Sequence, residues 1–169
     1  AMRRSAALPP ISCRAAWSRT RIAGTASTTP STSDTTTMPM LTAGEIGMNT
    51  YVYGYGPEDR ERLIVVDLGV TFADMGTTPG IDLIMADVSW LEERADRIEA
   101  IFITHAHEDH IGALGHLWPR LKKRVYARRF TAAIGRLKFD ELGLPTDVIQ
   151  TVASRPETIE AGPFRVQFV

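Results

Sequence analysis

The sequence predicts an α/β fold, in which helices are layered on a sheet. Segments typical of β-strands alternate along the chain with segments typical of amphipathic helices, and this alternation favours α/β layering. Two strand segments, 63–66 and 100–103, are apolar at every position, as expected for strands covered on both faces. Apolar residues then recur at helical spacing through 111–121. These features together predict a buried sheet with helices packed against it.

Length and composition are those of one ordinary folded domain. The chain has 169 residues, of which 44% are hydrophobic and 23% charged. A formal net charge of -1 gives no overall basic field, so total charge does not indicate a nucleic-acid partner. Cys13 is the only cysteine, which excludes an intrachain disulfide and fits a reducing compartment. No run of about 18 apolar residues is present, so we expect no membrane-spanning helix.

Residues 1–40 differ in composition from the rest. Arginine, serine and threonine dominate, and no acidic residue precedes Asp34. Such a segment cannot bury enough apolar surface to offset its ordering entropy, so we predict disorder here and a folded domain over 41–169. The same composition is typical of an organellar transit peptide. We favour an untargeted, cytoplasmic protein, because no apolar helix face repeats through the segment.

The first half of the predicted domain is rich in strands. Residues 50–53 and 63–66, with turn residues between them, predict a β-hairpin. Asp67 ends the second strand, and spacing alone leaves it equally open as a functional acid or a loop cap. Residues 70–79 predict a loop, and 81–86 a short strand or turn.

Helices become prominent in the second half. Ser89 with Glu92 predicts a capping box that starts a helix reaching Ile98. Further helices are predicted over 111–121 and 130–142, the latter stopped by Gly143. The remaining strands are predicted at 125–127, 148–152, 158–160 and 164–169. Because the sequence stops within the last of these strands, we expect the chain to be truncated.

A dense group of metal-ligating residue types follows the apolar run 100–103. His105, His107, Asp109 and His110 lie within six residues, and imidazole nitrogen and carboxylate oxygen are ligands that Zn²⁺ prefers. In extended backbone His105 and His107 share one side, so they can bind one ion together. Asp109 and His110 lie where the chain turns into a helix and can face a second ion. Two ions about 3.5–4 Å apart would activate a water and hold a phosphate or carbonyl oxygen.

Each of these features also has a less specific interpretation. A single histidine is more often a solvated residue than a ligand, but four ligand types at this spacing predict a metal site. We expect Glu108 to be a solvent-facing acid at the positive end of the next helix. The basic residues 122–124 and 128–129 flank a predicted strand and can contact phosphates. Solvated caps at a helix end are the favoured alternative for them.

Residues 104–114 resemble the signature motif of the metallo-β-lactamase fold. Together with 44–49, 53–56, 66–71 and 78–82, they look like the N-terminal part of the ribonuclease J family, in the β-CASP branch of that fold. The resemblance covers about 44–169 and excludes the first 40 residues. It implies an αββα sandwich, of which this chain would hold a truncated N-terminal part.

The resemblance also implies an activity and a set of roles. Ribonuclease J enzymes hydrolyse RNA phosphodiesters as 5′-to-3′ exonucleases and endonucleases, using two zinc ions. By the match, His105 and His107 would hold the first zinc, and Asp109 and His110 the second. Asp67 and Asp109 would be the catalytic acids, with Asp67 orienting the metal-site loop through hydrogen bonds.

Other parts of the family pattern fall outside this sequence. A further histidine, a bridging aspartate, the β-CASP domain and the C-terminal domain would lie beyond Val169. We therefore expect weak metal binding and little or no activity from this chain, and homodimers or homotetramers only of the full-length protein. Two alternatives stay open at this point: a small-molecule hydrolase of the same fold, such as a thioesterase or lactonase, and a non-catalytic metal-binding remnant.

Overall fold

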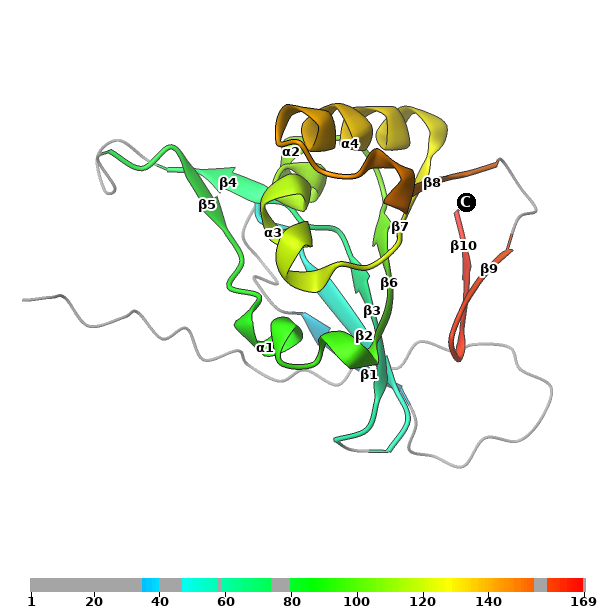
Figure 1. Cartoon of the computed structure of the whole chain (residues 1–169). Coiled ribbons are helices and arrows are strands. Elements are labelled where there is room, and N and C mark those ends of the chain that lie inside the picture. The colour runs from blue at the N-terminus through cyan, green and yellow to red at the C-terminus, as the bar shows by residue number, and fades with distance from the viewer. Residues whose placement is uncertain (1–34, 40–46, 58, 74–79, 154–157, 169) are drawn as a thin grey trace, which may run out of the picture.

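A mixed sheet forms the centre of the computed structural model, which describes residues 35–39, 47–57, 59–73, 80–153 and 158–168 (Figure 1). In these residues the sheet has six strands in the order β1-β2-β3-β6-β7-β8. The strands are β1 (Thr35–Pro39), β2 (Tyr51–Tyr55), β3 (Arg62–Val66), β6 (Ile98–Ile103), β7 (Val125–Arg128) and β8 (Ile149–Val152). β1, β2 and β3 pair antiparallel, whereas β3, β6, β7 and β8 pair parallel. The predicted α/β class and the β2–β3 hairpin are confirmed.

The parallel half of the sheet decides where the polar residues gather. β3 and β6 are in register at Val66 and Phe102, so Asp67 and Thr104 leave the sheet at the same edge. β7 runs parallel to β6 and ends at that edge too. The carboxyl ends of parallel strands are where α/β sheets place their binding groups. The edge after β3 and β6 is therefore the candidate site.

Helices cover one face of the sheet. They are α1 (Ser89–Glu92), α2 (Glu108–Ile111), α3 (Leu114–Leu121) and α4 (Arg129–Glu141), with 3₁₀ turns at Ala95–Arg97 and Thr146–Val148. Ile101 and Ile103 of β6 are buried against Leu114 and Phe139 from this layer. Fully burying one such side chain contributes about 1.5–3 kcal/mol. The helix that carries Asp109 and His110 belongs to this well-packed layer.

The opposite face of the sheet packs against a two-stranded hairpin. β9 (Thr158–Ala161) pairs antiparallel with β10 (Phe164–Gln167), on the side of the sheet away from the helices (Figure 1). Ile159 and Ala161 form a second buried cluster with Ile64 and Phe102. Both faces of the apolar strands β3 and β6 are therefore covered, as their composition predicted. A helix layer, a sheet and further strands agree with the predicted sandwich.

A second hairpin extends from the body of the domain. β4 (Val70–Phe72) pairs antiparallel with β5 (Leu83–Met85), beside the helix layer in Figure 1. The loop predicted over 70–79 is therefore wrong for its first three residues, while 74–79 lie outside the described residues. Three residues are too few to show a period of two, although Val70, Thr71 and Phe72 all favour strands.

The capping box predicted at Ser89 is wrong. Val88 is the N-cap residue of α1, and no side chain caps that helix. Ser89 instead donates from its backbone N–H and hydroxyl to Asp87 Oδ1, and Glu92 accepts from Arg120. Both members of the expected box therefore have other partners, and the helix ends at Glu92. Ile98, its predicted end, begins β6.

The helix predicted over 111–121 is divided into α2 and α3. Ala113 N–H donates to the carbonyl of Leu68 at 2.9 Å, so the chain between the helices is bound to the loop after β3. Gly112 permits this approach, since a Cβ there would lie 2.5 Å from both Glu108 O and Val70 Cγ2. α4 is close to its predicted bounds, and Gly143, with φ of +65°, ends it as expected.

Part of the N-terminal segment also forms a strand. β1 pairs with β2 from Thr35 opposite Tyr55 to Pro39 opposite Tyr51, so the structure differs at these five residues from the disorder expected over 1–40. The remaining predictions for 1–34, and the start of the domain at 41–46, lie outside the described residues. In the part of the chain that the structure describes, no helix is long and apolar enough to cross a membrane.

Candidate metal centre

Asp67 is the buried anchor of the site. Its side chain is 2% exposed, and its backbone N–H donates to Phe102 O at 2.8 Å. The carboxylate accepts from the Thr104 backbone N–H and hydroxyl and lies 2.8 Å from His110 Nδ1. Its φ is +65°, a left-handed conformation that aspartate tolerates better than most residues. A buried carboxylate at the end of β3 thus connects that strand to the residues after β6.

The Asp67 contact fixes the tautomer of His110. An ionised carboxylate only accepts hydrogen bonds, so Nδ1 of His110 carries the proton that lies between the two groups. Nε2 is then the nitrogen with the free lone pair. Metal-binding histidines are commonly oriented in this way, by a carboxylate on the ring nitrogen that does not bind the ion.

A second imidazole is fixed through Thr104. The Thr104 hydroxyl donates to Asp67, so it can accept from Nδ1–H of His105, which lies 3.0 Å from it. His105 then also presents Nε2 as its lone-pair nitrogen. One buried carboxylate therefore sets the orientation of two imidazoles, directly and through a hydroxyl.

The three imidazole rings of the motif lie together. The ring centroid of His105 is 4.0 Å from that of His110 and 4.6 Å from that of His107. His107 is the N-cap residue of α2, and its carbonyl accepts the backbone N–H of His110 at 2.9 Å. The three imidazole rings therefore lie close together at the edge of the sheet.

Asp109 and His110 form a close pair. Asp109 Oδ2 lies 3.4 Å from His110 Nε2, and their side chains are 34% and 20% exposed. Zinc bonds of about 2.0–2.2 Å place two ligand atoms of one tetrahedral ion about 3.4 Å apart. The pair therefore has a spacing and donor chemistry that fit one divalent ion.

The complete ligand set is less tightly arranged than this pair. Among the described residues, no group of three or more His, Cys, Asp or Glu side chains is arranged so that it could hold a metal ion. The fit to a metal consequently rests on the Asp109–His110 spacing and on the fixed tautomers of His105 and His110. The full set of His105, His107, Asp109 and His110 stays a prediction.

Sequence reasoning gave no role to Asn49, which the structure places at the same pair. The Asn49 side-chain amide donates to the carbonyl and the Oδ2 of Asp109, both at 3.0 Å, and lies 3.2 Å from His110 Nε2. Tyr51 hydroxyl donates to Asn49 Oδ1 at 3.2 Å. The only available signal was that Asn49 ends one of the segments that resemble the family.

Glu108 faces away from this cluster. Its carboxylate is half-exposed and accepts two hydrogen bonds from Lys138 Nζ of α4, at 2.8 and 3.0 Å. It is also in the first turn of α2, where an acid is favourable. The expectation that Glu108 starts a helix outside the ligand set agrees with the structure, and Lys138 is the partner that the sequence did not indicate.

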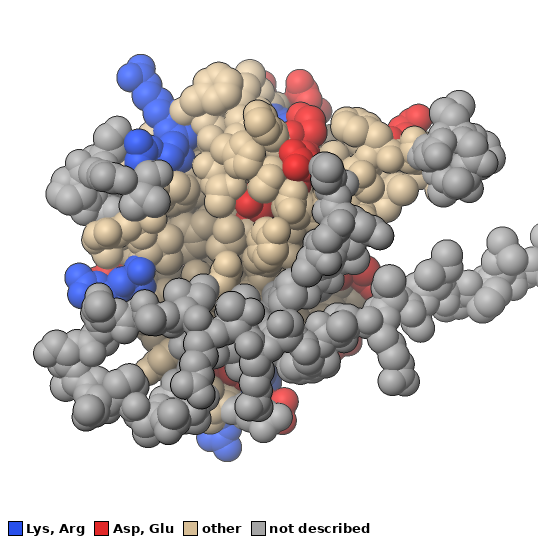
Figure 2. Space-filling model, turned by 180° about the vertical axis from the view of Figure 1, so that it is seen from behind, with Lys and Arg blue, Asp and Glu red and all other residues tan. Residues whose placement is uncertain are grey.

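The basic residues do not form one patch. Residues 122–124 precede β7, whereas Arg128 and Arg129 are at its other end, so a strand separates the two groups. On the face shown in Figure 2, Lys and Arg side chains of the described residues lie in separate groups near the margin. Of these five basic residues, Arg128 and Arg129 are at the edge that carries the histidines. Any phosphate contact by residues 122–124 would therefore be remote from the motif.

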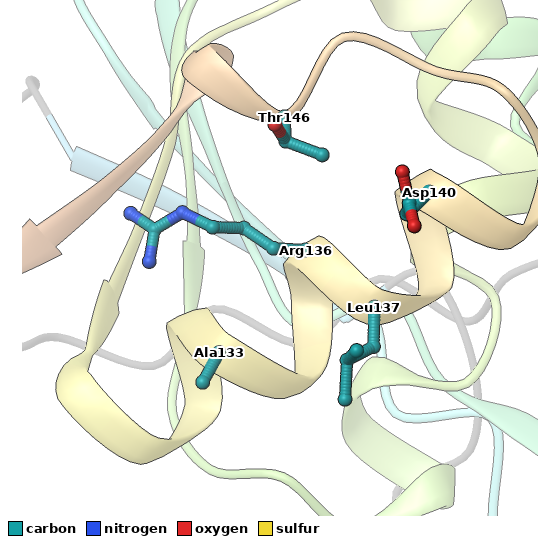
Figure 3. A pocket seen from close by; sticks show the side chains of 5 residues that line it. All are labelled: Ala133, Arg136, Leu137, Asp140 and Thr146. Carbon is teal, nitrogen blue, oxygen red and sulfur yellow. The ribbon is translucent and has the colours of Figure 1, made fainter.

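An open groove of about 460 Å³ lies on the outer side of α4 (Figure 3). It is lined by Ala133, Arg136, Leu137, Asp140 and Thr146, and none of these is a predicted site residue. Arg136 donates to Ile149 O at 2.6 Å and Thr151 Oγ1 at 2.9 Å, so its guanidinium is bound to β8. The groove offers no ligand chemistry comparable with that of the histidine cluster.

Comparison with known proteins agrees with the fold and the motif. The sequence profile of the metallo-beta-lactamase superfamily matches residues 44–166, most of the chain. The chain belongs to the metallo-β-lactamase superfamily. Membership in this superfamily implies a metal cofactor, without indicating which metal.

Relatives within the superfamily are named ribonuclease J. The chain is 42% identical over 132 residues to ribonuclease J of Sinorhizobium meliloti, a match that covers 78% of the chain and 23% of that relative. It is 38% identical over 128 residues to ribonuclease J of Corynebacterium glutamicum, covering 73% of the chain and 16% of the relative. Ribonuclease J2 of Bacillus subtilis is 40% identical over 100 residues, covering 59% of the chain and 17% of the relative. The resemblance to ribonuclease J is confirmed, and the chain spans less than a quarter of these relatives' length.

Proposed function

We propose that this chain contributes the metal-binding edge of a ribonuclease J-like hydrolase that cuts RNA phosphodiesters. The observation that carries the proposal is the grouping of three imidazole rings and Asp109 at the carboxyl ends of β3 and β6, with Asp67 fixing two of the rings. Relatives named ribonuclease J support RNA as the substrate. Two zinc ions, combined exonuclease and endonuclease activity, assembly of the full-length protein into dimers or tetramers, and a cytoplasmic location are parts of the same proposal.

Each residue has a defined task in the proposal. His105 and His107 would hold one divalent ion, and Asp109 and His110 a second. Divalent ions at such a site lower the pKa of a bound water and neutralise charge on a phosphate. Asp67 would keep Nε2 of His110 free to bind by accepting from Nδ1 of that ring, and Nε2 of His105 through the Thr104 hydroxyl. Because Asp67 is buried, water does not compete for these hydrogen bonds.

The alternative substrates receive less support. A thioesterase or lactonase of the same superfamily would use the same ligand types, because a fold does not determine its chemistry. The relatives named ribonuclease J favour RNA over these small molecules. No feature of the described residues favours a thioester or a lactone.

A ribonuclease assay tests the proposal. The protein expressed from the complete reading frame that contains this chain is incubated with 5′-monophosphorylated RNA and Zn²⁺ or Mn²⁺. We expect cleavage, and we expect His107→Ala to reduce it by more than about 100-fold, the upper loss seen even for outer partners of metal ligands. His116→Ala is the matched control, because His116 is exposed and lies outside the motif.

Two results would contradict this assignment. Intact RNA in the presence of either metal would remove the support for a nuclease. Turnover of a thioester by the same preparation, with no effect on RNA, would favour the small-molecule alternative instead.

A further inference from the structure

The side chain of Asn49 lies against the donor atoms of two proposed metal ligands. Its amide nitrogen is 3.0 Å from Asp109 Oδ2 and 3.2 Å from His110 Nε2, and these two atoms are themselves 3.4 Å apart. Asp109 O and Oδ2 only accept hydrogen bonds, so the atom that faces them must be the NH₂ group. Tyr51 hydroxyl, on the other side, donates to Asn49 Oδ1 and supports the same orientation.

The backbone of Asn49 strengthens this arrangement. Its N–H donates to Asp109 O at 2.9 Å, and its carbonyl accepts the N–H of Gly69 at 3.0 Å. One residue therefore connects the segment before β2 to the loop after β3 and to the first turn of α2. The side chain acts on ligand atoms from a backbone that is already fixed.

Counting hydrogens shows which contacts can persist when a cation binds. The amide has two N–H groups for three acceptors, Asp109 O, Asp109 Oδ2 and His110 Nε2. A carboxylate oxygen has two lone pairs and can serve an amide and an ion together. His110 Nε2 has only one lone pair, so a cation that binds there must replace the contact with the Asn49 amide. The two bonds to Asp109 use both N–H groups and remain possible.

We propose that Asn49 is a positioning residue of the metal centre, which holds Asp109 in its ligating orientation and covers the lone pair of His110 until a cation arrives. Without the amide the Asp109 side chain is free to rotate, so metal binding must also order that side chain. Loss of the amide therefore weakens metal binding. This inference rests on the metal centre of the proposed function.

Zinc titration of the 169-residue chain tests the inference. Asn49→Leu keeps the branched shape of the side chain and removes both polar ends, while the backbone N–H can still donate to Asp109. We expect its affinity for Zn²⁺ to fall by about tenfold, as for other outer partners of metal ligands. The visible absorption of bound Co²⁺ is expected to change with it, because the orientation of Asp109 changes.

Gln150→Leu is the matched control. The Gln150 amide also donates to a backbone carbonyl, that of Asp147, at 2.7 Å, but it is remote from the motif. We expect this variant to keep wild-type zinc affinity and the wild-type Co²⁺ spectrum. If Asn49→Leu does not fold, Asn49→Ala is measured in the same way, with the same expected loss.

The possible results separate the inference from the proposed function. Failure of the wild-type chain to bind Zn²⁺ or Co²⁺ would overturn the metal centre and this inference with it. Wild-type zinc binding combined with equal or tighter binding by the Asn49 variants would overturn the role of Asn49 alone.

Discussion

Asp67 is the residue that organises the other polar groups of the site. It is buried, and its carboxylate receives donors from Thr104 and His110, two residues that are more than 35 positions away in the sequence. Such a group is favourable only while its partners are present, because a buried carboxylate without them is costly. The sequence placed this acid at the end of a buried strand but could not show which residues it contacts.

Replacing Asp67 tests this dependence. Asp67→Ala leaves the Thr104 N–H and His110 Nδ1 without their acceptor, so we expect the free energy of unfolding to fall by about 3 kcal/mol. Urea unfolding of the 169-residue chain measures the change. Asp87→Ala is a suitable control, because Asp87 also accepts hydrogen bonds but is exposed.

If burial makes the Asp67 hydrogen bonds important, the two substitutions should lower the free energy of unfolding by clearly different amounts. We expect Asp87→Ala to cost about 1 kcal/mol, typical of losing an ordinary hydrogen bond. An equal, small loss for both variants would show that the Asp67 network does not hold the loop.

Among the elements, α2 is bound to its neighbours through its backbone. Asn49 N–H donates to Asp109 O, Leu68 N–H donates to His110 O, and Gly69 lies directly beside this turn. A Cβ added at Gly69 would be 1.7 Å from Asp109 O, which is far inside contact distance. The first turn of α2 can therefore take this position only because residue 69 has no side chain.

Gly69→Ala is expected to displace α2. Since the clash is with a backbone oxygen, the helix or the loop must move, and we expect a loss of stability of about 3 kcal/mol or more. Gly54→Ala is the matched control, because a Cβ there would meet its nearest neighbour, Leu63 Cδ2, at 3.3 Å. Urea unfolding of both variants gives the comparison.

The Gly69 prediction has a clear contrary result. Stability equal to that of Gly54→Ala would show that α2 does not lie against Gly69 as described. We expect Gly69→Ala to lower the affinity for zinc as well as the stability, because Asp109 and His110 are both in the displaced turn.

Elements with long, regular patterns were predictable, and short ones were not. α4 and the strands β3 and β6 have unambiguous apolar spacing, so their approximate positions follow from sequence. The break between α2 and α3 lies where Ala113 N–H donates to the carbonyl of Leu68, which is distant in sequence. Local patterns cannot report such tertiary contacts.

In the candidate site, too, some features follow from the sequence and others depend on tertiary contacts. His105, His107, Asp109 and His110 are close in sequence and of recognisable ligand types, so they could be named without a structure. Their supports come from other elements, as with Asn49 before β2 and Asp67 at the end of β3. Asn49 carries no chemical signature of its own and is identified only by its distances.

At the scale of the whole molecule, the parallel strands bring the site together. β3 and β6 end side by side, so Asp67 and the histidine motif meet although they are separated in the chain. The helix layer and the β9–β10 hairpin then bury both faces of these strands. The chain spans less than a quarter of the length of these ribonuclease J relatives.

Anomalous diffraction at the zinc absorption edge tests the central claim most directly. Crystals of the chain grown with Zn²⁺ are expected to show an anomalous peak bounded by His105, His107, Asp109 and His110. A zinc-loaded crystal with no peak among these four side chains, or with its zinc bound at His116, would contradict the account.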